Sequence, residues 1–169
     1  SLIKMNLQAK IPPLSETDVL NDPSRWEQDC RGLAASARAA GFPAPWIFTG
    51  SSTFVMWRKM ASCFPEVDVL NHAFGGSTYY DLAFFSTQLV FPFHPARIII
   101  SSVDNDLGRG RHPKLVFADL RLCLNLIEYA LPGTPVTITS VKPSMARASL
   151  RPAQDLLNEW TRHFAGQHE

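Results

Sequence analysis

Four short runs of apolar and β-branched residues alternate along the chain with longer segments whose apolar residues recur at helical spacing. The runs that we expect to form strands are 45–49 (PWIFT), 67–73 (VDVLNHA), 96–101 (ARIIIS) and 135–141 (PVTITSV). The expected helices lie at 24–40, 54–63, 78–90, 114–131 and 151–164. Strands that alternate with helices are typical of a parallel sheet with helices on both faces. The sequence therefore predicts an α/β fold, a three-layer α/β/α sandwich with a mainly parallel sheet of about four strands.

Two of these helices have well-marked ends. Asp22 and Pro23 have the form of an N-cap followed by a proline in the first turn, and the helix that they begin should stop near Gly41. The helix at 114–131 carries an apolar face and ends at Pro132-Gly133. Because parallel strands are covered on both faces, we expect their apolar side chains to be largely buried. The expected core comprises Ile47, Phe48, Val69, Leu70, Ile98, Ile99, Val116 and Ile138.

Length and composition limit the classes of protein that fit. A chain of 169 residues can bury a sizeable core, and a net charge of +1 gives no reason to expect nucleic acid or an anionic membrane as partner. No apolar run approaches the ~20 residues that a bilayer needs, and no signal peptide is visible. The three cysteines form no C-x-x-C pair. We expect a cytoplasmic protein without integral membrane association, with a surface arm at 1–21 and the α/β domain at 22–169.

The segments that follow the four predicted strands contain glycine, serine, aspartate and asparagine. They are Gly50-Ser51-Ser52, Phe74-Gly75-Gly76-Ser77-Thr78, Asp104-Asn105-Asp106 and Lys142-Pro143-Ser144. Each has an ordinary structural interpretation, because serines cap helices, glycines form turns and Asx side chains stabilise loops. Parallel strands, however, bring the segments after them to one edge of the sheet, where open α/β sheets bind ligands. The sequence thus predicts a polar site at that edge.

The residue types in these segments suit acyl transfer. A serine at a strand-to-helix turn holds its hydroxyl out of the sheet, at the positive end of a helix dipole. A glycine lets a backbone N–H approach a substrate closely, and an asparagine amide is a second neutral donor. Together with the N–H of the serine they would form an oxyanion hole, in which each donor lowers the barrier by ~3 kcal/mol.

The order and spacing of these segments resemble those of the SGNH, or GDSL, serine hydrolases, which are esterases and lipases. Gly50-Ser51-Ser52 matches the Gly-Asp-Ser block of the family, which makes Ser52 the nucleophile by resemblance. Gly76 in NHAFGGST matches the oxyanion glycine, and VDND matches Gly-x-Asn-Asp with Asn105 as the oxyanion asparagine. The likeness is closest to a bacterial subgroup with GSS, FGGST, DND and KPS.AR, and it runs from about Trp26 to the C-terminus. It implies a flavodoxin-like sheet, a small-molecule ester as substrate and no cofactor.

Three features depart from the family pattern. Ser51 stands in place of the aspartate, and Val103 stands where the third block has glycine. The Asp-x-x-His block, which in the family follows a fifth strand and supplies the acid and base of the triad, is missing from these 169 residues. No triad histidine or aspartate is therefore identified, and a serine without a base is a poor nucleophile near neutral pH. We expect either a hydrolase cut before its last strand or a ligand-binding module without turnover, with an exposed sheet edge at which two copies could pair.

Other kinds of site fit the sequence less well. DNDLG is similar to part of a calcium loop, but Leu115 stands where that loop needs glutamate, so we expect no metal site. The basic residues Arg109, Arg111 and Lys114 suit a solvated loop better than a nucleic-acid surface, and they could also meet an anionic substrate group. The main alternative is a flavodoxin-like module in which TGSST cradles a phosphate or a flavin. A protein without flavin absorbance would count against that module.

Overall fold

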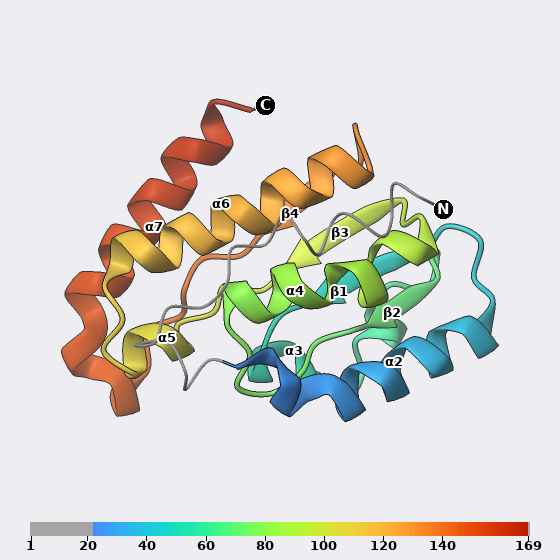
Figure 1. Ribbon diagram of the computed structural model, residues 1–169, viewed down its shortest axis with the longest axis horizontal. Helices are drawn as coiled ribbons and strands as arrows, with labels where there is room; N and C mark the ends of the chain where they lie inside the picture. Colours follow the sequence, from blue (N-terminus) through green and yellow to red (C-terminus); the bar gives the residue numbers. More distant parts are fainter. Residues whose placement is uncertain (1–21, 169) are drawn as a thin grey trace.

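The structure is a computed structural model that describes residues 22–168 (Figure 1). The arm predicted at 1–21 lies outside these residues. Four strands form one sheet: β1 (Trp46–Thr49), β2 (Val69–Asn71), β3 (Arg97–Ile100) and β4 (Val136–Ile138). Their order across the sheet is β2-β1-β3-β4, and every pairing is parallel. The predicted α/β fold with a four-stranded parallel sheet is confirmed.

Each strand lies within its predicted run and is shorter than that run. The residues left over at the carboxyl end of a run continue into the loop at that edge of the sheet. After β2, for example, the N–H of His72 still donates to the carbonyl of Phe48 at 2.7 Å, and the N–H of Phe74 donates to the carbonyl of Gly50 at 3.0 Å. The loops after β1 and β2 therefore stay side by side beyond the end of the sheet.

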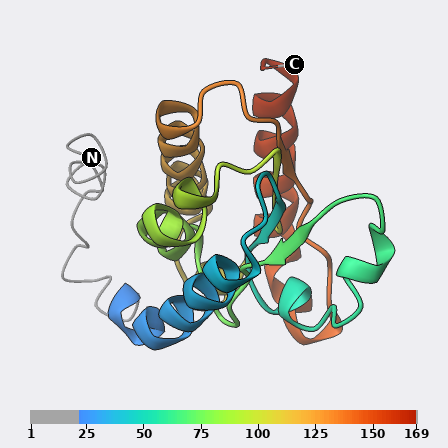
Figure 2. The ribbon, with the colours of Figure 1, turned by 90° about the vertical axis from the view of Figure 1, so that its right-hand side faces the viewer.

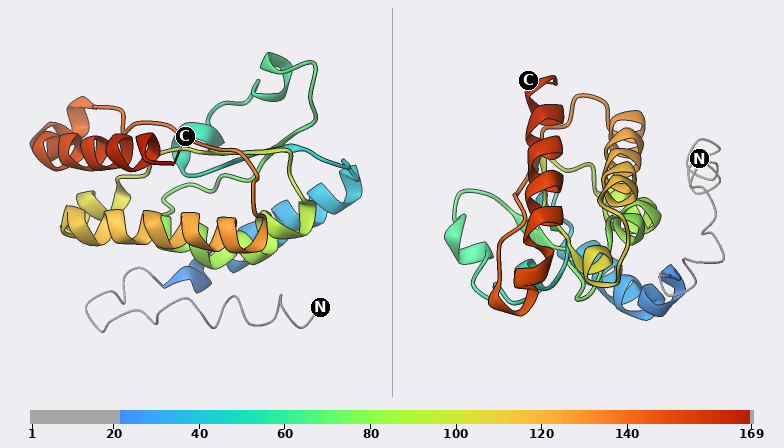
Figure 3. Two further views of the ribbon diagram at one scale, coloured as in Figure 1. Left: turned by 90° about the horizontal axis from the view of Figure 1, so that it is seen from above. Right: turned by 90° about the vertical axis from the view of Figure 1, so that its left-hand side faces the viewer.

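Helices cover both faces of the sheet, which gives the three predicted layers (Figures 2 and 3). One face is covered by α2 (Glu27–Ala40), α4 (Tyr79–Leu89) and α6 (Pro113–Ala130). The other face carries α3 (Ser52–Val55), the 3-10 turn η4 (Ala61–Cys63) and α7 (Arg151–Gly166). The remaining elements are η3 (Pro23–Trp26), η5 (Phe91–Phe93), α5 (Asn105–Gly108) and η6 (Met145–Leu150). Within residues 22–168, none of the helices combines the length and the apolar character that a bilayer-spanning segment requires.

Side chains of the two central strands alternate between two hydrophobic clusters. Ile47 and Ile98 belong to the larger cluster, beneath α2, α4 and α6. Phe48 and Ile99, the next residues of β1 and β3, belong to a smaller cluster with Phe54 on the other face. This is the two-residue alternation of a sheet that is buried on both sides.

The predicted core is largely found, with two exceptions. Val69 and Ile138 are only half-buried, whereas the other predicted core residues are buried. These two side chains lie on β2 and β4, the outer strands of the sheet, which have a neighbouring strand on one side only. The expectation that these side chains are largely buried holds for the central strands and was wrong for these two.

The helix predicted at 54–63 is also wrong. In its place α3 covers four residues, and turns then lead to η4. Aromatic packing explains the difference: Phe54, Trp57 and Phe64 all lie against the ring of Phe48, with ring centroids 5.4, 6.2 and 5.3 Å away. In a single helix, Phe54 and Phe64 would lie about 15 Å apart along the axis, too far for both to contact one ring. Tertiary packing therefore overrides the local helical spacing.

The helix expected from residue 24 begins as the 3-10 turn η3 and becomes α-helical at Glu27. Asp22 caps this turn as predicted, since its carboxylate accepts from the N–H of Ser24 at 2.9 Å. Gly41 ends α2 in the left-handed conformation. Through η3 the chain enters the fold next to the loop that follows β2, which positions Trp26 for the site.

Candidate active site

The loops after β1 and β3 meet at Gly50. This residue has φ of 145°, and a Cβ placed on it would lie 1.8 Å from Oγ of Ser101, so only glycine fits. The close approach lets the N–H of Ser51 donate to Ser101 Oγ at 3.1 Å. The carbonyl of Gly50 accepts from Ser77 Oγ at 2.9 Å. Hydrogen bonds therefore connect the loops after β1, β2 and β3 at the carboxyl edge of the sheet.

Gly76 lies in the loop after β2 and is supported from η3. It has φ of 79°, and a Cβ placed on it would lie 3.3 Å from the indole of Trp26. The indole N–H of Trp26 donates to the carboxylate of Asp81 at 3.2 Å, and Arg25 pairs with the same carboxylate at 3.1 Å. Burial raises the pKa of Asp81, while its bonds to the N–H of Thr78 and to Arg25 act in the opposite direction. Asp81 and Thr78 also form the capping box that starts α4, so the loop and the helix are fixed together.

Donors from two loops converge on one serine hydroxyl. The N–H of Gly76 donates to Oγ of Ser51 at 3.1 Å, and Nδ2 of Asn105 donates to it at 2.9 Å. Ser51 is only 5% exposed. Ser52, the nucleophile predicted by resemblance, is the next residue, the first of α3, and it is exposed. The structure thus brings Gly76 and Asn105 together at the Gly50-Ser51-Ser52 turn, and the hydroxyl that both contact belongs to Ser51.

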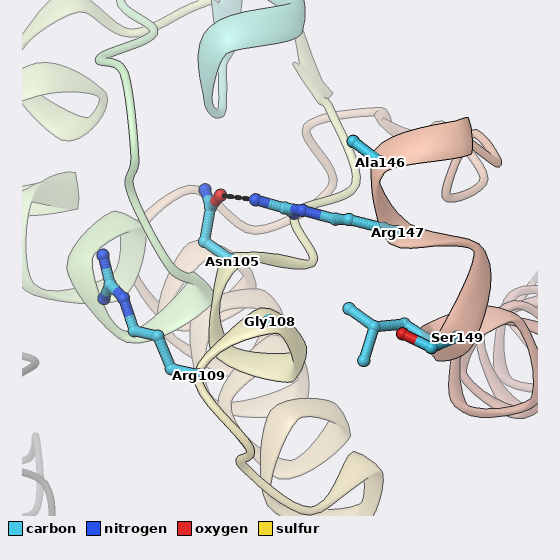
Figure 4. Close-up of a pocket in the computed structure, with 7 residues that line it drawn as sticks. Asn105, Gly108, Arg109, Ala146, Arg147 and Ser149 are labelled. Atoms are coloured by element: carbon cyan, nitrogen blue, oxygen red, sulfur yellow. Dashed lines mark hydrogen bonds between the residues drawn. The ribbon is translucent and has the colours of Figure 1, made fainter.

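The amide of Asn105 is bonded at both ends. Its Nδ2 donates to the carbonyl of Ser77 at 2.8 Å as well as to Ser51. Its Oδ1 accepts from Nη2 of Arg147 at 2.9 Å, the bond drawn in Figure 4. Arg147 comes from η6 and forms a salt bridge with Asp104, the residue before Asn105. The asparagine is therefore fixed by the segment that follows β4 as well as by its own loop.

Sequence reasoning did not assign a role to Arg147. The segment that it placed at the site, Lys142-Pro143-Ser144, is exposed. The described contact that reaches the site from this part of the chain is made by Arg147, three residues further on. The available signal was the arginine that ends the KPS.AR phrase, because a guanidinium near the carboxyl edge of the sheet is a candidate partner for an amide or a carboxylate.

A polar hollow lies on one side of the donors. It has a volume of about 370 Å³, and Asn105, Arg109 and Arg147 are among the residues that line it. Figure 4 shows Arg147 reaching Asn105 from one side, while the side chain of Arg109 lies on the other side. The lining includes two guanidinium groups, of which that of Arg147 is paired with Asp104, and the charge of Arg109 favours a ligand with polar or anionic groups.

A second, more apolar hollow lies between α2, α3 and the loop after β2. It has a volume of about 570 Å³, and its lining residues include Leu33 of α2, Val55 of α3 and Phe74 and Gly75 of the loop after β2. Val55 is 44% exposed, and Met56 and Trp57, which follow it, are 71% and 37% exposed. The lining also includes the polar residues Gln28, Asp29 and Ser36 of α2, so the apolar part of the hollow lies toward α3 and the loop after β2.

Two buried carboxyl groups lie behind Asn105. Asp106, the next residue of α5, is 1% exposed, and burial raises its pKa to about 7, with the charge of Asp119 adding to the effect. Asp119 of α6 forms a salt bridge with Arg111 at 3.1 Å. Asp106 therefore binds a proton more tightly than an ordinary aspartate does, in the same helical turn as the oxyanion donor candidate.

The histidines lie elsewhere. Nδ1 of His72 contacts the carbonyl of Leu89, and burial lowers the pKa of this imidazole. His112 caps α6, and its ring accepts from the N–H of Lys114. Among residues 22–168, no histidine hydrogen-bonds to Ser51 or Ser52, and no group of three metal-binding side chains is arranged to hold an ion. The contacts within residues 22–168 therefore identify no histidine as a base for the serine turn, as in the sequence analysis.

Comparison with known proteins supports the fold assignment. The sequence matches no protein-family model and no curated protein. A GDSL-like lipase from Bacteroides thetaiotaomicron is 19% identical with a TM-score of 0.64, and the match covers 88% of this chain and 75% of that one. A provisionally assigned acylhydrolase from Bacteroides fragilis is 18% identical with a TM-score of 0.64, covering 92% and 76%. A provisionally assigned lipolytic protein of the G-D-S-L family from Desulfitobacterium hafniense is 14% identical with a TM-score of 0.63, covering 74% and 73%. This chain thus has an SGNH/GDSL-type hydrolase fold.

Proposed function

We propose that the protein is a serine ester hydrolase in which Ser52 attacks the ester carbonyl and Gly76 and Asn105 stabilise the resulting oxyanion. One observation carries the proposal: the N–H of Gly76 and the amide of Asn105, from two different loops, point at the same oxygen position beside the serine turn. Two fixed neutral donors about 3 Å from one oxygen are the arrangement that stabilises a developing oxyanion. Each such donor is worth a factor of roughly 10²–10³ in kcat.

The choice of Ser52 over Ser51 rests on access and on the backbone. Ser52 is exposed, whereas Ser51 is 5% exposed and its N–H already donates to Ser101. The N–H of Ser52 is the first of α3 and has no partner within its helix, so it can serve as a third oxyanion donor. In the free protein, Oγ of Ser51 accepts the hydrogen bonds from Gly76 and Asn105. We propose that the carbonyl oxygen of a bound substrate replaces it as their acceptor. The competing assignment, Ser51 as nucleophile, is favoured by its contact with both donors.

The reaction then has two balanced steps. Oγ of Ser52 forms a bond to the carbonyl carbon and loses its proton to hydroxide, and the tetrahedral oxyanion is held by Gly76 and Asn105. The bond to the alcohol breaks, and the alcohol leaves with a proton taken from water. Water next attacks the acyl-enzyme, which releases the carboxylic acid and restores the Ser52 hydroxyl.

The two hollows indicate what kind of ester the site would accept. The substrate carbonyl would lie at Asn105, which itself lines the polar hollow. One arm of the ester would then extend toward Arg109 and carry polar or anionic groups. The other arm would extend past Gly75 toward Leu33 and Val55 and be apolar. We therefore propose a small ester with one polar and one apolar side as the substrate class.

The test is the hydrolysis of 4-nitrophenyl acetate by the 169-residue chain and matched serine variants at pH 7 and pH 9.5. With hydroxide as proton acceptor, wild type should differ little from Ser52→Ala at pH 7 and exceed it at pH 9.5. Ser51→Ala should be at least as active as wild type, because it frees the donors. Asn105→Ala should lower the Ser52-dependent rate by on the order of 10²-fold. Ser62→Ala is the control, since Ser62 is exposed and hydrogen-bonds to Lys59 instead.

Two results would contradict the assignment. Loss of activity in Ser51→Ala with normal activity in Ser52→Ala would transfer the nucleophile to Ser51. Equal rates for wild type and all three variants at both pH values would exclude serine catalysis by this chain and favour the ligand-binding alternative. Circular dichroism of each variant at pH 9.5 shows whether the fold is intact.

A further inference from the structure

Asn105 can act as an oxyanion donor only if its amide keeps one orientation. A side-chain amide can turn by 180° about χ2, which exchanges its donor end and its acceptor end. Two acceptors, Ser51 Oγ and the carbonyl of Ser77, lie at the nitrogen end at 2.9 and 2.8 Å. Nη2 of Arg147 lies at the oxygen end at 2.9 Å. Because a guanidinium can only donate, it specifies the oxygen end, and the N–H groups must then face the serine turn.

Arg147 is itself held in place by a chain of contacts. Its Nη1 donates to one carboxylate oxygen of Asp104, and Nε2 of Gln154 donates to the other oxygen at 2.8 Å. Gln154 belongs to α7 and is 1% exposed. The side chain of Arg147 is 34% exposed and that of Asp104 is 18% exposed, so the ion pair is partly shielded from water. These contacts connect a buried residue of α7 to the amide of Asn105.

We propose that Arg147 is a positioning residue for the oxyanion donor: it fixes the amide orientation of Asn105 and, as a cation at the amide oxygen, strengthens its N–H groups as donors. The inference rests on the proposed function for its catalytic consequence, though not for its structural one. The charge-assisted bond from Arg147 draws electron density from the amide nitrogen toward the oxygen. A more positive N–H interacts more strongly with the negative charge that develops in the transition state.

The first test reads the amide directly and needs no catalysis. The side-chain amide signals of Asn105 are identified in a ¹H–¹⁵N spectrum by their loss in Asn105→Ala. In Arg147→Ala we expect these signals to shift and their hydrogen exchange to become at least about tenfold faster, because the amide is no longer bonded at its oxygen end. Arg151→Ala is the matched control, since this arginine lies four residues further on and pairs with Asp155 on the surface of α7.

The second test is a double-mutant cycle on the Ser52-dependent esterase rate at pH 9.5. Arg147→Ala should lower kcat by about 10–100-fold, part of the value of one oxyanion donor, with a smaller effect on KM. In the Asn105→Ala background the same substitution should cause no further loss, because the residue acts through Asn105. Arg147→Lys should retain an intermediate rate, since lysine keeps the charge without the two-pronged geometry.

The outcomes separate the inference from the proposed function. Unchanged Asn105 amide signals in Arg147→Ala would overturn the positioning role whatever the activity. Losses that multiply in the double variant would also overturn it, because Arg147 would then act independently of Asn105. Shifted amide signals in a protein that shows no Ser52-dependent hydrolysis would support the positioning role and reject the proposed function. If Arg147→Ala fails to fold, the same measurements on Arg147→Lys decide.

Discussion

Replacing Gly50 by alanine should be among the most destabilising single-methyl changes in this chain. The added Cβ would lie 1.8 Å from Oγ and 2.8 Å from Cβ of Ser101, so β1 and β3 must separate at the site. The left-handed φ of 145° costs about 1–3 kcal/mol for a residue with a side chain. Overpacking costs about another 1–3 kcal/mol. Loss of the bond from Ser51 N–H to Ser101 Oγ adds roughly 1 kcal/mol. The free energy of unfolding should therefore fall by about 3–7 kcal/mol.

Two other glycines separate these contributions. Gly110 has φ of 85° with no atom near its ideal Cβ position, so Gly110→Ala should show only the conformational cost, about 1–3 kcal/mol. Gly32 lies within α2 with open space and an ordinary φ, so Gly32→Ala should stabilise the protein by about 0.5–1 kcal/mol. Urea unfolding followed by circular dichroism gives the three free energies. A loss for Gly50→Ala no larger than that for Gly110→Ala would refute the close approach of Gly50 to Ser101.

The remaining predictions concern the interior and the reaction. The pKa of Asp106 is raised from 3.8 to about 7 in the folded protein. As the pH rises, the unfolded protein therefore loses this proton at a lower pH than the folded protein does. The free energy of unfolding should consequently fall by up to about 4 kcal/mol between pH 4 and 7. Asp106→Asn should remove most of that slope in urea titrations at several pH values, and an unchanged slope would contradict the assignment. Ile99→Ala in central β3 should cost ~2–5 kcal/mol, and Ile138→Ala in outer β4 should cost less because Ile138 is only half-buried. Equal thermal shifts would refute this difference in burial between the central and outer strands. The Ser52-dependent rate should rise about tenfold per pH unit, whereas a plateau with a midpoint near pH 7 would point to a histidine base.

The sequence predicted the strands and most helices because their signals are local. The runs at β1 and β3 consist of apolar residues bounded by proline or glycine and polar residues, and the helix that ends before Pro132-Gly133 has a continuous apolar face. The helix at 54–63 could not be predicted in the same way. Its spacing is compatible with a helix, and a continuous helix is prevented by the packing of Phe54, Trp57 and Phe64 around Phe48 on one face of the sheet. That arrangement depends on the assembled fold.

In the candidate active site, too, some residues could be predicted from local signals and others depend on the assembled fold. The loops that carry Gly76 and Asn105 were identified because each follows a strand, and the topology of a parallel sheet brings such loops together. The choice of these two residues within the loops came from the resemblance to the SGNH hydrolases. The donors of Gly76 and Asn105 contact the hydroxyl of Ser51 and not that of Ser52. This choice depends on the backbone conformation at Gly50, which the spacing of residues in the sequence does not predict. Arg147 contacts Asn105 across 42 residues of sequence, through an irregular turn after an outer strand. A contact of that kind has no periodic signature.

The most direct test of the account is to identify the serine that reacts with a fluorophosphonate. The 169-residue chain is incubated with the reagent at pH 9, digested, and analysed by tandem mass spectrometry, which distinguishes adducts on Ser51 and Ser52. We predict an adduct on Ser52 that forms faster than any on the exposed Ser62, is slowed in Asn105→Ala and is retained in Ser51→Ala. An adduct on Ser51, or labelling of Ser52 no faster than that of Ser62, would contradict the proposal that Ser52 is a nucleophile served by the Gly76 and Asn105 donors.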